Sequence, residues 1–364
     1  MQSIIHVIFP GPFGGAEKLV LMGLQALEKA LGVELLIIME RRYPRFAEDY
    51  AKRARKLGIN CRVLSCHGRV DIGLWRALRA ISNSSKPSLV HCHGYKASLY
   101  GLWAFAGRKV VTTLHGTTSH NVATKIYEWL FFRSLPLYDG VISVSSEIHE
   151  KLQKRRIPDA RRCLITNMAS FPREAARRES YDGSKQALKI LFVGRVSPEK
   201  GLVHLIESLE VLALDFRLTV VGAGECLEDC RERVKAARME DRVLFAGFQD
   251  DIKGYLRGSH LLVIPSLREG LPLTLLEAAA SCIPVVCSRV GGMPEVMEIY
   301  KAGVLTEPGD AGSLAEAIER VGRQYEAFKL TASHNVAKLA ERFGEKAWLD
   351  RTLNFYSCVY KDHS

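Results

Sequence analysis

The sequence predicts an α/β protein built from two doubly wound parallel sheets, each covered by its own helices. Its 364 residues suit two domains of about 100–200 residues each. Short apolar runs alternate along the chain with helical patterns of about 10–18 residues. A polar stretch with Pro and Gly, from Ser170 to Gln186, is predicted to link the two halves. The carboxyl ends of the strands in both halves can then face a common cleft.

Most predicted strands are apolar on both faces, as expected for parallel strands covered by helices. Those of the first half are Ile4–Phe9, Glu34–Met39, Cys61–Leu64, Leu89–His93, Lys109–Leu114, Gly140–Val144 and Cys163–Thr166. Those of the second half are Lys189–Val193, Arg217–Val221, Val243–Ala246, Leu261–Ile264, Val285–Cys287 and Gly303–Leu305.

The composition is that of an ordinary soluble protein, with 47% apolar and 25% charged residues. No apolar run reaches the roughly 18 residues of a membrane span. We interpret the start, Met1 to Pro10, as a first strand rather than a signal peptide, because it lacks a basic segment. The nine scattered cysteines favour a reducing compartment, so we expect a cytoplasmic protein.

The positive charge is concentrated in the first half. Residues 1–183 contain 28 basic and 15 acidic side chains, whereas the remainder contains 23 basic and 25 acidic ones. This asymmetry favours an anionic partner for the first half, such as membrane lipid, a phosphorylated acceptor or nucleic acid. The alternative is a basic surface that serves solubility alone.

The segment Ser266 to Ala280 is the most informative motif. A predicted strand ends before it, and a polar loop with Glu269, Gly270 and Pro272 precedes an Ala/Leu-rich helix with Glu277 in its first turn. The glycine allows close backbone approach, and the free N–H groups of a helix start can hold phosphate. The two carboxylates can accept hydrogen bonds from sugar hydroxyls, which suggests a nucleotide sugar. Alternatively, Thr274 and Glu277 form a capping box.

Two further strand–helix junctions have the residues of an anion site. Arg195 and Lys200 flank the turn after the first strand of the second half, and two cations there could clamp a diphosphate. Ser197 could equally be a helix N-cap followed by Pro. Gly14 and Gly15 precede the first helix, where their N–H groups could approach a ligand or simply form a tight turn.

Histidines and cysteines offer weaker signals. His115 is placed at the carboxyl end of a strand and can point into the cleft, although a lone histidine is more often structural. His91 and His93 share one face of their strand, with Cys92 on the other, but no further ligand lies nearby in sequence. Cys226 and Cys230 also lack partners, so we predict no metal site. The glycines at 222 and 224 are not followed by the third glycine of a dinucleotide fingerprint, which argues against a nicotinamide dehydrogenase.

Taken in order, the motifs resemble those of a retaining glycosyltransferase of family 4 with the GT-B fold, and the resemblance covers nearly the whole chain. The second-half motifs are specific and the first-half ones are looser. They are Gly-Gly-Ala-Glu from Gly14, His91-Cys-His93, His115-Gly-Thr, Val141-Ile-Ser-Val-Ser, Phe192 to Gly201, Val221-Gly-Ala-Gly, Phe245-Ala-Gly-Phe248, the segment with Glu269 and Glu277, and Gly291-Gly-Met-Pro-Glu295.

The resemblance implies a role for each matching residue. Arg195 and Lys200 would bind the donor diphosphate, Glu277 the ribose hydroxyls, and Glu269 a hydroxyl of the transferred sugar. The backbone of the segment Gly270, Leu271, Pro272, Leu273 and Thr274 would cap phosphate and sugar. His115 would lie near the reacting carbon, and Gly14 and Gly15 would approach the diphosphate from the other domain. The segment Thr166-Asn-Met-Ala departs from the usual Asn-Gly-Val, which puts the geometry of that loop in doubt.

We accordingly expect an acceptor-side domain over 1–170, a linker over 171–186 and a nucleotide-sugar-binding domain over 187–346, with a helix over 347–364 packing back on the first domain. The expected enzyme is a metal-independent, retaining hexosyltransferase. It would move a sugar from a nucleoside diphosphate sugar to a glycan or lipid-linked acceptor in cell-surface polysaccharide synthesis, without a cofactor or nucleic acid. A GT-B epimerase or phosphorylase is the alternative, and a nucleic-acid-binding protein is a more distant one.

The basic first half also suggests docking at the inner face of the membrane. From Phe46 on, the segment Arg41 to Lys56 predicts a basic amphipathic helix in which Phe46 and Tyr50 lie one turn apart. Each Lys or Arg near an anionic bilayer contributes about 1 kcal/mol, so Lys52, Arg53, Arg55 and Lys56 could support reversible binding. A solvated helix is the alternative.

Overall fold

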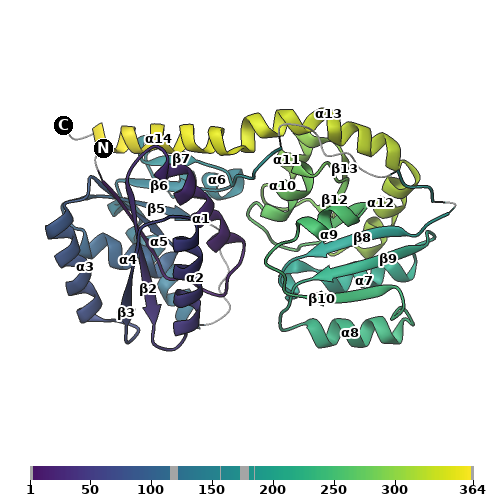
Figure 1. Ribbon diagram of the computed structural model, residues 1–364, viewed down its shortest axis with the longest axis horizontal. Helices are drawn as coiled ribbons and strands as arrows, with labels where there is room; N and C mark the ends of the chain where they lie inside the picture. Colours follow the sequence, from purple (N-terminus) through teal and green to yellow (C-terminus); the bar gives the residue numbers. More distant parts are fainter. Residues whose placement is uncertain (1–2, 115–121, 156, 173–179, 184, 362–364) are drawn as a thin grey trace. The chain divides into compact units, whose positions relative to one another are not determined.

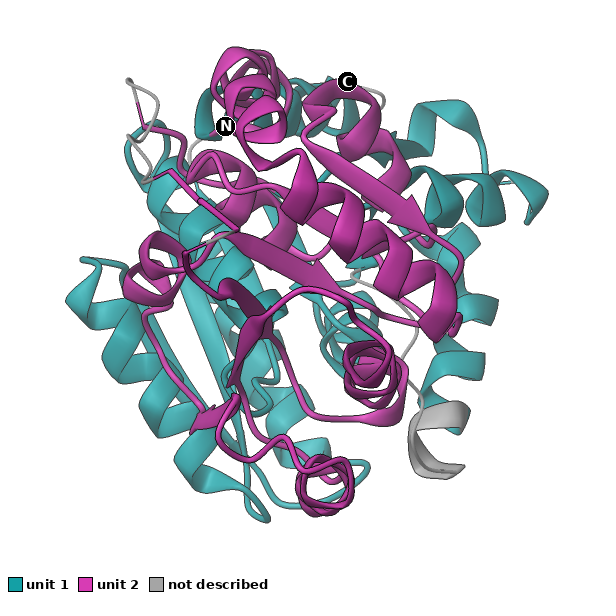
Figure 2. Ribbon diagram, turned by 90° about the vertical axis from the view of Figure 1, so that its right-hand side faces the viewer, with its two compact units in different colours: residues 1–167, 345–364 teal, residues 168–344 magenta. Residues whose placement is uncertain are grey.

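The computed structural model describes residues 3–114, 122–155, 157–172, 180–183 and 185–361 (Figure 1). Contacts divide them into two units, coloured separately in Figure 2. The first unit comprises residues up to 167 together with those from 345 on, and the second comprises residues 168–344. Ala169 already belongs to the second unit, because its N–H donates to the carbonyl of Phe343 over 3.0 Å.

The first unit contains a seven-stranded, all-parallel sheet in the order β3-β2-β1-β4-β5-β6-β7. Its strands are β1 (Ile4–Ile8), β2 (Val33–Glu40), β3 (Cys61–Cys66), β4 (Leu89–His93), β5 (Lys109–Leu114), β6 (Gly140–Ser143) and β7 (Arg162–Leu164). Its helices are α1 (Gly15–Glu28), α2 (Pro44–Lys56), α3 (Ile72–Ser85), α4 (Tyr95–Ala104), α5 (Val122–Ser134), α6 (Ser146–Lys154) and α14 (Glu345–Lys361), with short 3-10 helices at Leu135–Leu137 and Asp159–Arg161.

The second unit contains a six-stranded parallel sheet in the order β10-β9-β8-β11-β12-β13. Its strands are β8 (Leu188–Val193), β9 (Phe216–Val221), β10 (Val243–Gly247), β11 (Leu261–Ile264), β12 (Val285–Ser288) and β13 (Gly303–Thr306). Its helices are η3 (Pro198–Lys200), α7 (Leu202–Glu210), α8 (Leu227–Ala236), α9 (Lys253–Gly258), α10 (Leu273–Ala280), α11 (Met293–Tyr300), α12 (Ala311–Arg323) and α13 (Tyr325–Phe343).

Each sheet lies between two apolar layers. In the first unit, side chains of α3, α4, α5 and α6 form one core cluster, and those of α1, α2 and α14 form the other. In the second unit, α7, α8 and α12 contribute to one cluster, and α9, α10, α11 and α13 to the other. The fold is therefore the predicted pair of doubly wound parallel sheets, and all thirteen predicted strands are present with ends that differ by at most two residues.

The last helix, α14, returns to the first unit and packs against α1. Trp348 is in contact range of Gly23, where an added Cβ would lie 2.7 Å from the indole ring. Phe355 similarly lies against Gly140 of β6. Both contacts depend on a glycine that leaves room for an aromatic ring.

The structure changes the interpretation of α2. The predicted amphipathic helix is present, but Tyr50 is only 1% exposed and its hydroxyl donates to the carbonyl of Glu17 over 3.3 Å. Ala47, Ala51 and Ala54 are buried on the same face. The apolar face of α2 therefore packs into the core, and Tyr50 is not available as an apolar contact with a membrane.

Candidate functional site

The predicted donor residues of the second unit gather where β8 and β11, two neighbouring parallel strands, end. Arg195 follows β8, and Lys200 ends η3. Gly201 comes next in the left-handed conformation, with φ of 67°, and an added Cβ would lie 2.1 Å from the carbonyl oxygen of Pro265. Only glycine lets the chain pass this close to the end of β11, and this approach brings Lys200 beside the loop that follows that strand.

The loop after β11 is tied to the turn after β8 by polar contacts. The ammonium group of Lys200 forms an ion pair with the carboxylate of Glu269, and both side chains are largely buried. The hydroxyl of Ser266 donates to the same carboxylate over 3.2 Å. The N–H of Leu267 donates to the carbonyl of Glu199 over 2.8 Å. The cation and the carboxylate are thus held in fixed positions at one edge of the sheet.

The consecutive glycines Gly291 and Gly292 pack against the loop that contains Glu269 and Gly270. The N–H of Gly292 donates to the carbonyl of Gly270 over 2.5 Å. Gly291 has a φ of 58°, and a Cβ on it would lie 2.3 Å from the carbonyl oxygens of both Glu269 and Gly270. The sequence motif Gly291-Gly-Met-Pro-Glu295 did not by itself indicate this supporting role. Two consecutive glycines after a buried strand were the sequence feature that could have indicated a close backbone contact at this position.

The start of α10 excludes the capping box. The helix begins at Leu273, its N-cap is Pro272, and no side chain caps it. Thr274 is therefore the second helical residue rather than the N-cap that a capping box requires. Glu277 is the fifth helical residue, in the second turn rather than in the predicted first turn. The Glu277 side chain is half-buried. In the preceding segment from Gly270 to Thr274, Leu271, Pro272 and Leu273 are buried.

Arg195 differs from Lys200 in having no ion-pair partner among the residues that the structure describes, and its side chain is exposed. The structure thus brings Arg195, Lys200, Glu269, the start of α10 and Glu277 into one unit. Gly14 and Gly15 are the N-cap and first residue of α1 in the other unit. His115 lies outside the described residues.

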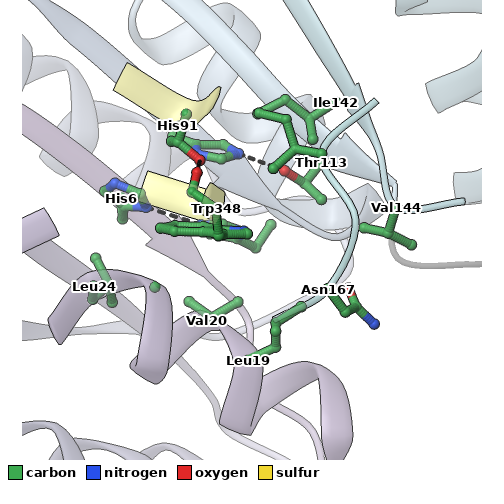
Figure 3. A pocket seen from close by; sticks show the side chains of 14 residues that line it. His6, Leu19, Val20, Leu24, His91, Thr113, Ile142, Val144, Asn167 and Trp348 are labelled. Atoms are coloured by element: carbon green, nitrogen blue, oxygen red, sulfur yellow. Dashed lines mark hydrogen bonds between the residues drawn. The ribbon is translucent and has the colours of Figure 1, made fainter. Parts of the chain in front are cut away.

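A buried histidine cluster occupies the first unit (Figure 3). His6 of β1 lies opposite His91 of β4, and its Nδ1 is 2.9 Å from Nε2 of His93. The Nδ1 of His91 is 2.5 Å from the hydroxyl of Tyr356, and its Nε2 is 2.7 Å from Oγ1 of Thr113. The three histidines line a cavity of about 30 Å³ between the sheet, α1 and α14. As predicted, His91 and His93 share one face, whereas Cys92 packs against Gly101 of α4 on the other.

The cluster has three potential metal ligands, with nitrogens within 4.8 Å of one another. His6 is far from His91 and His93 in sequence and was not among the predicted candidates; the pairing of β1 with β4 brings it to them. Both nitrogens of His91 already form hydrogen bonds, so a metal would have to replace one of them. The cluster also contains no carboxylate to balance a buried divalent charge. We therefore interpret it as a hydrogen-bonded network of neutral imidazoles.

The buried His6 should make the first unit sensitive to acid. Burial lowers the pKa of His6 to about 3, whereas it is near 6.5 in an unfolded chain. Between these values the unfolded state binds a proton that the folded state does not, so the free energy of unfolding falls as the pH falls. Relative to His6→Leu, the wild type should lose about 1.4 kcal/mol for each pH unit below 6.5.

Urea unfolding between pH 4 and 7 measures this difference. All four tryptophans belong to the first unit, so their fluorescence reports on that unit alone. Because His91 and His93 remain in both proteins, the comparison reports on His6 and on its hydrogen bond to His93. Equal pH dependence of the two proteins would contradict the assignment of a buried neutral imidazole.

Two doubly wound parallel-sheet units, one with a cation, a carboxylate and a glycine-rich loop at the carboxyl ends of its strands, are typical of a two-domain protein that binds a nucleotide. Comparison with known families agrees. The family described as "Glycosyltransferase Family 4" matches residues 13–169, and "Glycosyl transferases group 1" matches residues 174–347. Both descriptions are of glycosyltransferases and together they match nearly the whole chain, so the chain is a glycosyltransferase, an enzyme, with the GT-B fold.

Known relatives extend over most of the chain. It is 26% identical over 308 residues to the N-acetyl-alpha-D-glucosaminyl L-malate synthase of Bacillus anthracis, covering 80% of this chain and 79% of the relative. It is 27% identical over 271 residues to the UDP-Gal:alpha-D-GlcNAc-diphosphoundecaprenol alpha-1,3-galactosyltransferase of Escherichia coli, covering 69% of each. The crystal structure of Anabaena Alr3699/HepE with UDP-glucose superposes with a TM-score of 0.83 at 20% identity, over 98% of this chain and 100% of that one.

Among the described residues, no helix combines the length and the apolar character needed to span a bilayer.

Proposed function

We propose that the protein transfers a sugar from a nucleoside diphosphate sugar to a glycan or lipid-linked acceptor, with retention of the anomeric configuration, in the synthesis of a cell-surface polysaccharide. The observation that carries the proposal is the pairing of Lys200 with Glu269 beside the Gly270 loop. One cation for phosphate and one carboxylate for a sugar hydroxyl lie at the same strand ends, as a donor with both groups requires. The galactosyltransferase relative, which is named for UDP-Gal, and the UDP-glucose complex of the Anabaena protein support this donor class.

The proposed chemistry follows from where charge develops. As the bond between the anomeric carbon and the diphosphate breaks, the carbon gains oxocarbenium character and the leaving oxygens gain negative charge. Arg195, Lys200 and the N–H groups at the start of α10 would stabilise those oxygens. Glu277 would accept hydrogen bonds from the ribose, and Glu269 from the transferred sugar. In this proposal His115, Gly14 and Gly15 contribute from the first unit, the acceptor hydroxyl attacks the face that the diphosphate leaves, and the departing phosphate takes its proton.

A ligand screen followed by a transfer assay tests the proposal. The matching nucleoside diphosphate sugar, at about 100 times its Kd, should stabilise the protein by roughly 2.7 kcal/mol, which a thermal-shift panel detects. With that donor, release of the nucleoside diphosphate should depend on an added glycan or lipid-linked acceptor. A panel in which no nucleotide sugar binds overturns the donor assignment. Donor turnover that is equal with and without acceptor instead favours an epimerase or a hydrolytic activity.

Substitutions of Glu277 and Glu269 should have different effects on nucleotide binding and on turnover. Glu277→Gln should raise the Kd for the free nucleoside diphosphate, because the ribose contact forms without the sugar. Glu269→Gln should not raise that Kd, because it leaves Lys200 free for the diphosphate, but it should lower kcat, because the carboxylate is assigned to the transferred sugar. Calorimetry and initial rates measure both. If each change lowers only the melting temperature, the carboxylates are structural and the assignments are wrong.

Activity should not require a divalent metal. The two cations and the start of α10 are proposed to balance the diphosphate, and no Asp-x-Asp motif occurs in the sequence to hold a metal against it. Initial rates should therefore be unchanged in EDTA. Loss of turnover in EDTA and its recovery with Mg²⁺ or Mn²⁺ would show that a metal takes part.

A further inference from the structure

Tryptophans are concentrated on the outer surface of three successive helices of the first unit. The chain has four tryptophans, and Trp75 of α3, Trp103 of α4 and Trp129 of α5 are all exposed. Trp103 is 64% and Trp129 61% exposed, whereas Trp348 of α14 is partly buried beside the histidine cavity. Tryptophan buries a large area when it finds a partner, so three exposed ones on one layer of helices indicate a surface that is covered in use.

Helix α5 has apolar residues on both its inner and its outer side. Ile126, Trp129 and Leu130 are exposed at spacings of three and four residues, which places them on one stripe. Phe131 on the opposite side is buried in the core. A helix that packs on a single core usually carries a polar outer face. The exposed stripe of α5 therefore consists of apolar side chains that do not take part in the core.

Hydrogen bonds connect the loop before α3 to both α4 and α5. The N–H of Asp71, just before α3, donates to the hydroxyl of Tyr100 on α4 over 2.6 Å. The hydroxyl of Tyr127 on α5 donates to the carbonyl of Arg69 over 2.6 Å. Helix α4 also contacts both α3 and α5 (Figure 1). We call the exposed apolar residues of this layer the tryptophan surface: Val70, Ile72, Trp75, Trp103, Ile126, Trp129 and Leu130.

The same part of the chain is strongly basic. Residues 67–134 contain nine Lys and Arg but only two acidic residues, and two of the nine, Lys96 and Lys109, are largely buried in ion pairs with Glu40 and Asp139. The carboxylate of one of these, Asp71, accepts hydrogen bonds from the N–H groups of His67 and Leu74. Arg76 on α3 and Arg133 on α5 are exposed, and the Arg133 guanidinium lies 5.7 Å from the centre of the Trp129 ring. The layer thus carries exposed cations as well as exposed apolar side chains.

We propose that the tryptophan surface docks the protein on a bilayer that contains anionic lipid. Tryptophan prefers the interface between lipid and water, aliphatic side chains enter the acyl region, and arginines reach the anionic headgroups. A second copy of the chain would bring one basic surface against another, which like charges disfavour. Nucleic acid could bind the arginines through its phosphates and stack its bases on the indole rings, but it would make no favourable contact with the four exposed Ile, Val and Leu side chains.

This surface differs from the one that the sequence suggested. Helix α2 carries Lys52, Arg55 and Lys56 on its exposed side, but Tyr50 faces the core. Arg53 is paired with Asp49 and lies over the ring of Phe13. Tyr43 and Leu57 are exposed at the two ends of α2, but its exposed side carries mainly charge and no tryptophan.

Vesicle flotation tests the proposal with two pairs of matched variants. Wild-type protein should float with vesicles of phosphatidylcholine and phosphatidylglycerol, and less with phosphatidylcholine alone or at high salt. The double variant Trp103→Gln/Trp129→Gln should lower the partition coefficient on the order of tenfold. The control Val211→Gln/Leu330→Gln replaces two equally exposed apolar residues of the second unit and should leave it unchanged. Arg76→Gln/Arg133→Gln should weaken binding more than Lys52→Gln/Lys56→Gln on α2.

Each remaining outcome decides for or against the proposal. Brominated phosphatidylglycerol should quench the tryptophan fluorescence of the wild type, because three of the four rings would enter the bilayer. Flotation of the tryptophan variant at the wild-type level overturns the proposal, as does an absence of wild-type flotation. Dimerisation without lipid that depends on Trp103 and Trp129 assigns the surface to a second copy, and tight binding of RNA without vesicle binding assigns it to nucleic acid; both also overturn it. Donor binding by calorimetry remains a separate test, since the membrane proposal does not depend on which sugar is transferred.

Discussion

Replacing Arg195 or Lys200 by alanine is expected to weaken nucleoside diphosphate binding by about 1.5–3 kcal/mol, the range for a hydrogen bond to a charged group. For Arg195 the physical reason is direct, because its exposed guanidinium has no ion-pair partner among the described residues and can meet phosphate as a two-pronged donor. For Lys200 the variant also leaves the largely buried carboxylate of Glu269 without its cation, and that negative charge would repel the diphosphate. The loss for Lys200→Ala should therefore be the larger of the two.

Titration calorimetry with free nucleoside diphosphate measures both effects. Lys338→Ala is the matched control, because it removes an exposed cation from α13 in the same unit and should not change the Kd. Double replacement of Lys200 and Glu269 by Ala and Gln removes the repulsion and should recover part of the lost affinity. Wild-type affinity in both single variants would exclude the diphosphate clamp.

Gly291→Ala should abolish most of the transfer activity, even though the residue is not proposed to touch the donor. The backbone at Gly291 is left-handed, which costs an ordinary residue roughly 1–2 kcal/mol. The new methyl group would also meet the carbonyl oxygens of Glu269 and Gly270 at 2.3 Å, so the loop must move. A shift of about 1 Å in groups that position a substrate can cost on the order of a hundredfold in rate.

The matched change is Gly258→Ala, at the end of α9. It lies in the same unit, its φ is not positive, and no atom lies within 4 Å of an added Cβ. This variant should keep the wild-type rate and melting temperature. Gly291→Ala should keep the fold, as judged by circular dichroism, but lose affinity for the nucleotide sugar. Wild-type kinetics for Gly291→Ala would show that the loop does not need this support.

The layered fold could be predicted because its signal is local. In a parallel sheet covered by helices, every strand is a short run of apolar residues bounded by loops, and this pattern is visible without knowing which strand pairs with which. The order of the strands, such as β1 between β2 and β4, depends on contacts between distant segments. Helix α14 illustrates this difference, because its place against α1 depends on Trp348 meeting the space above Gly23.

The candidate donor site could be proposed from residue types at strand–helix junctions, because parallel strands bring their carboxyl ends to one edge. The sequence by itself therefore determined the fold class, the family resemblance and the residues assigned to the donor. Only the tertiary structure decided that Lys200 pairs with Glu269, that Gly291 supports their loop and that Thr274 is not a helix cap. It also added His6 to His91 and His93, turned Tyr50 of α2 into the core, and left the tryptophans of α3, α4 and α5 exposed. The physical reason is that hydrogen bonding and burial depend on which distant segments pack together. Periodicity along one helix shows that an apolar face exists but not what that face packs against.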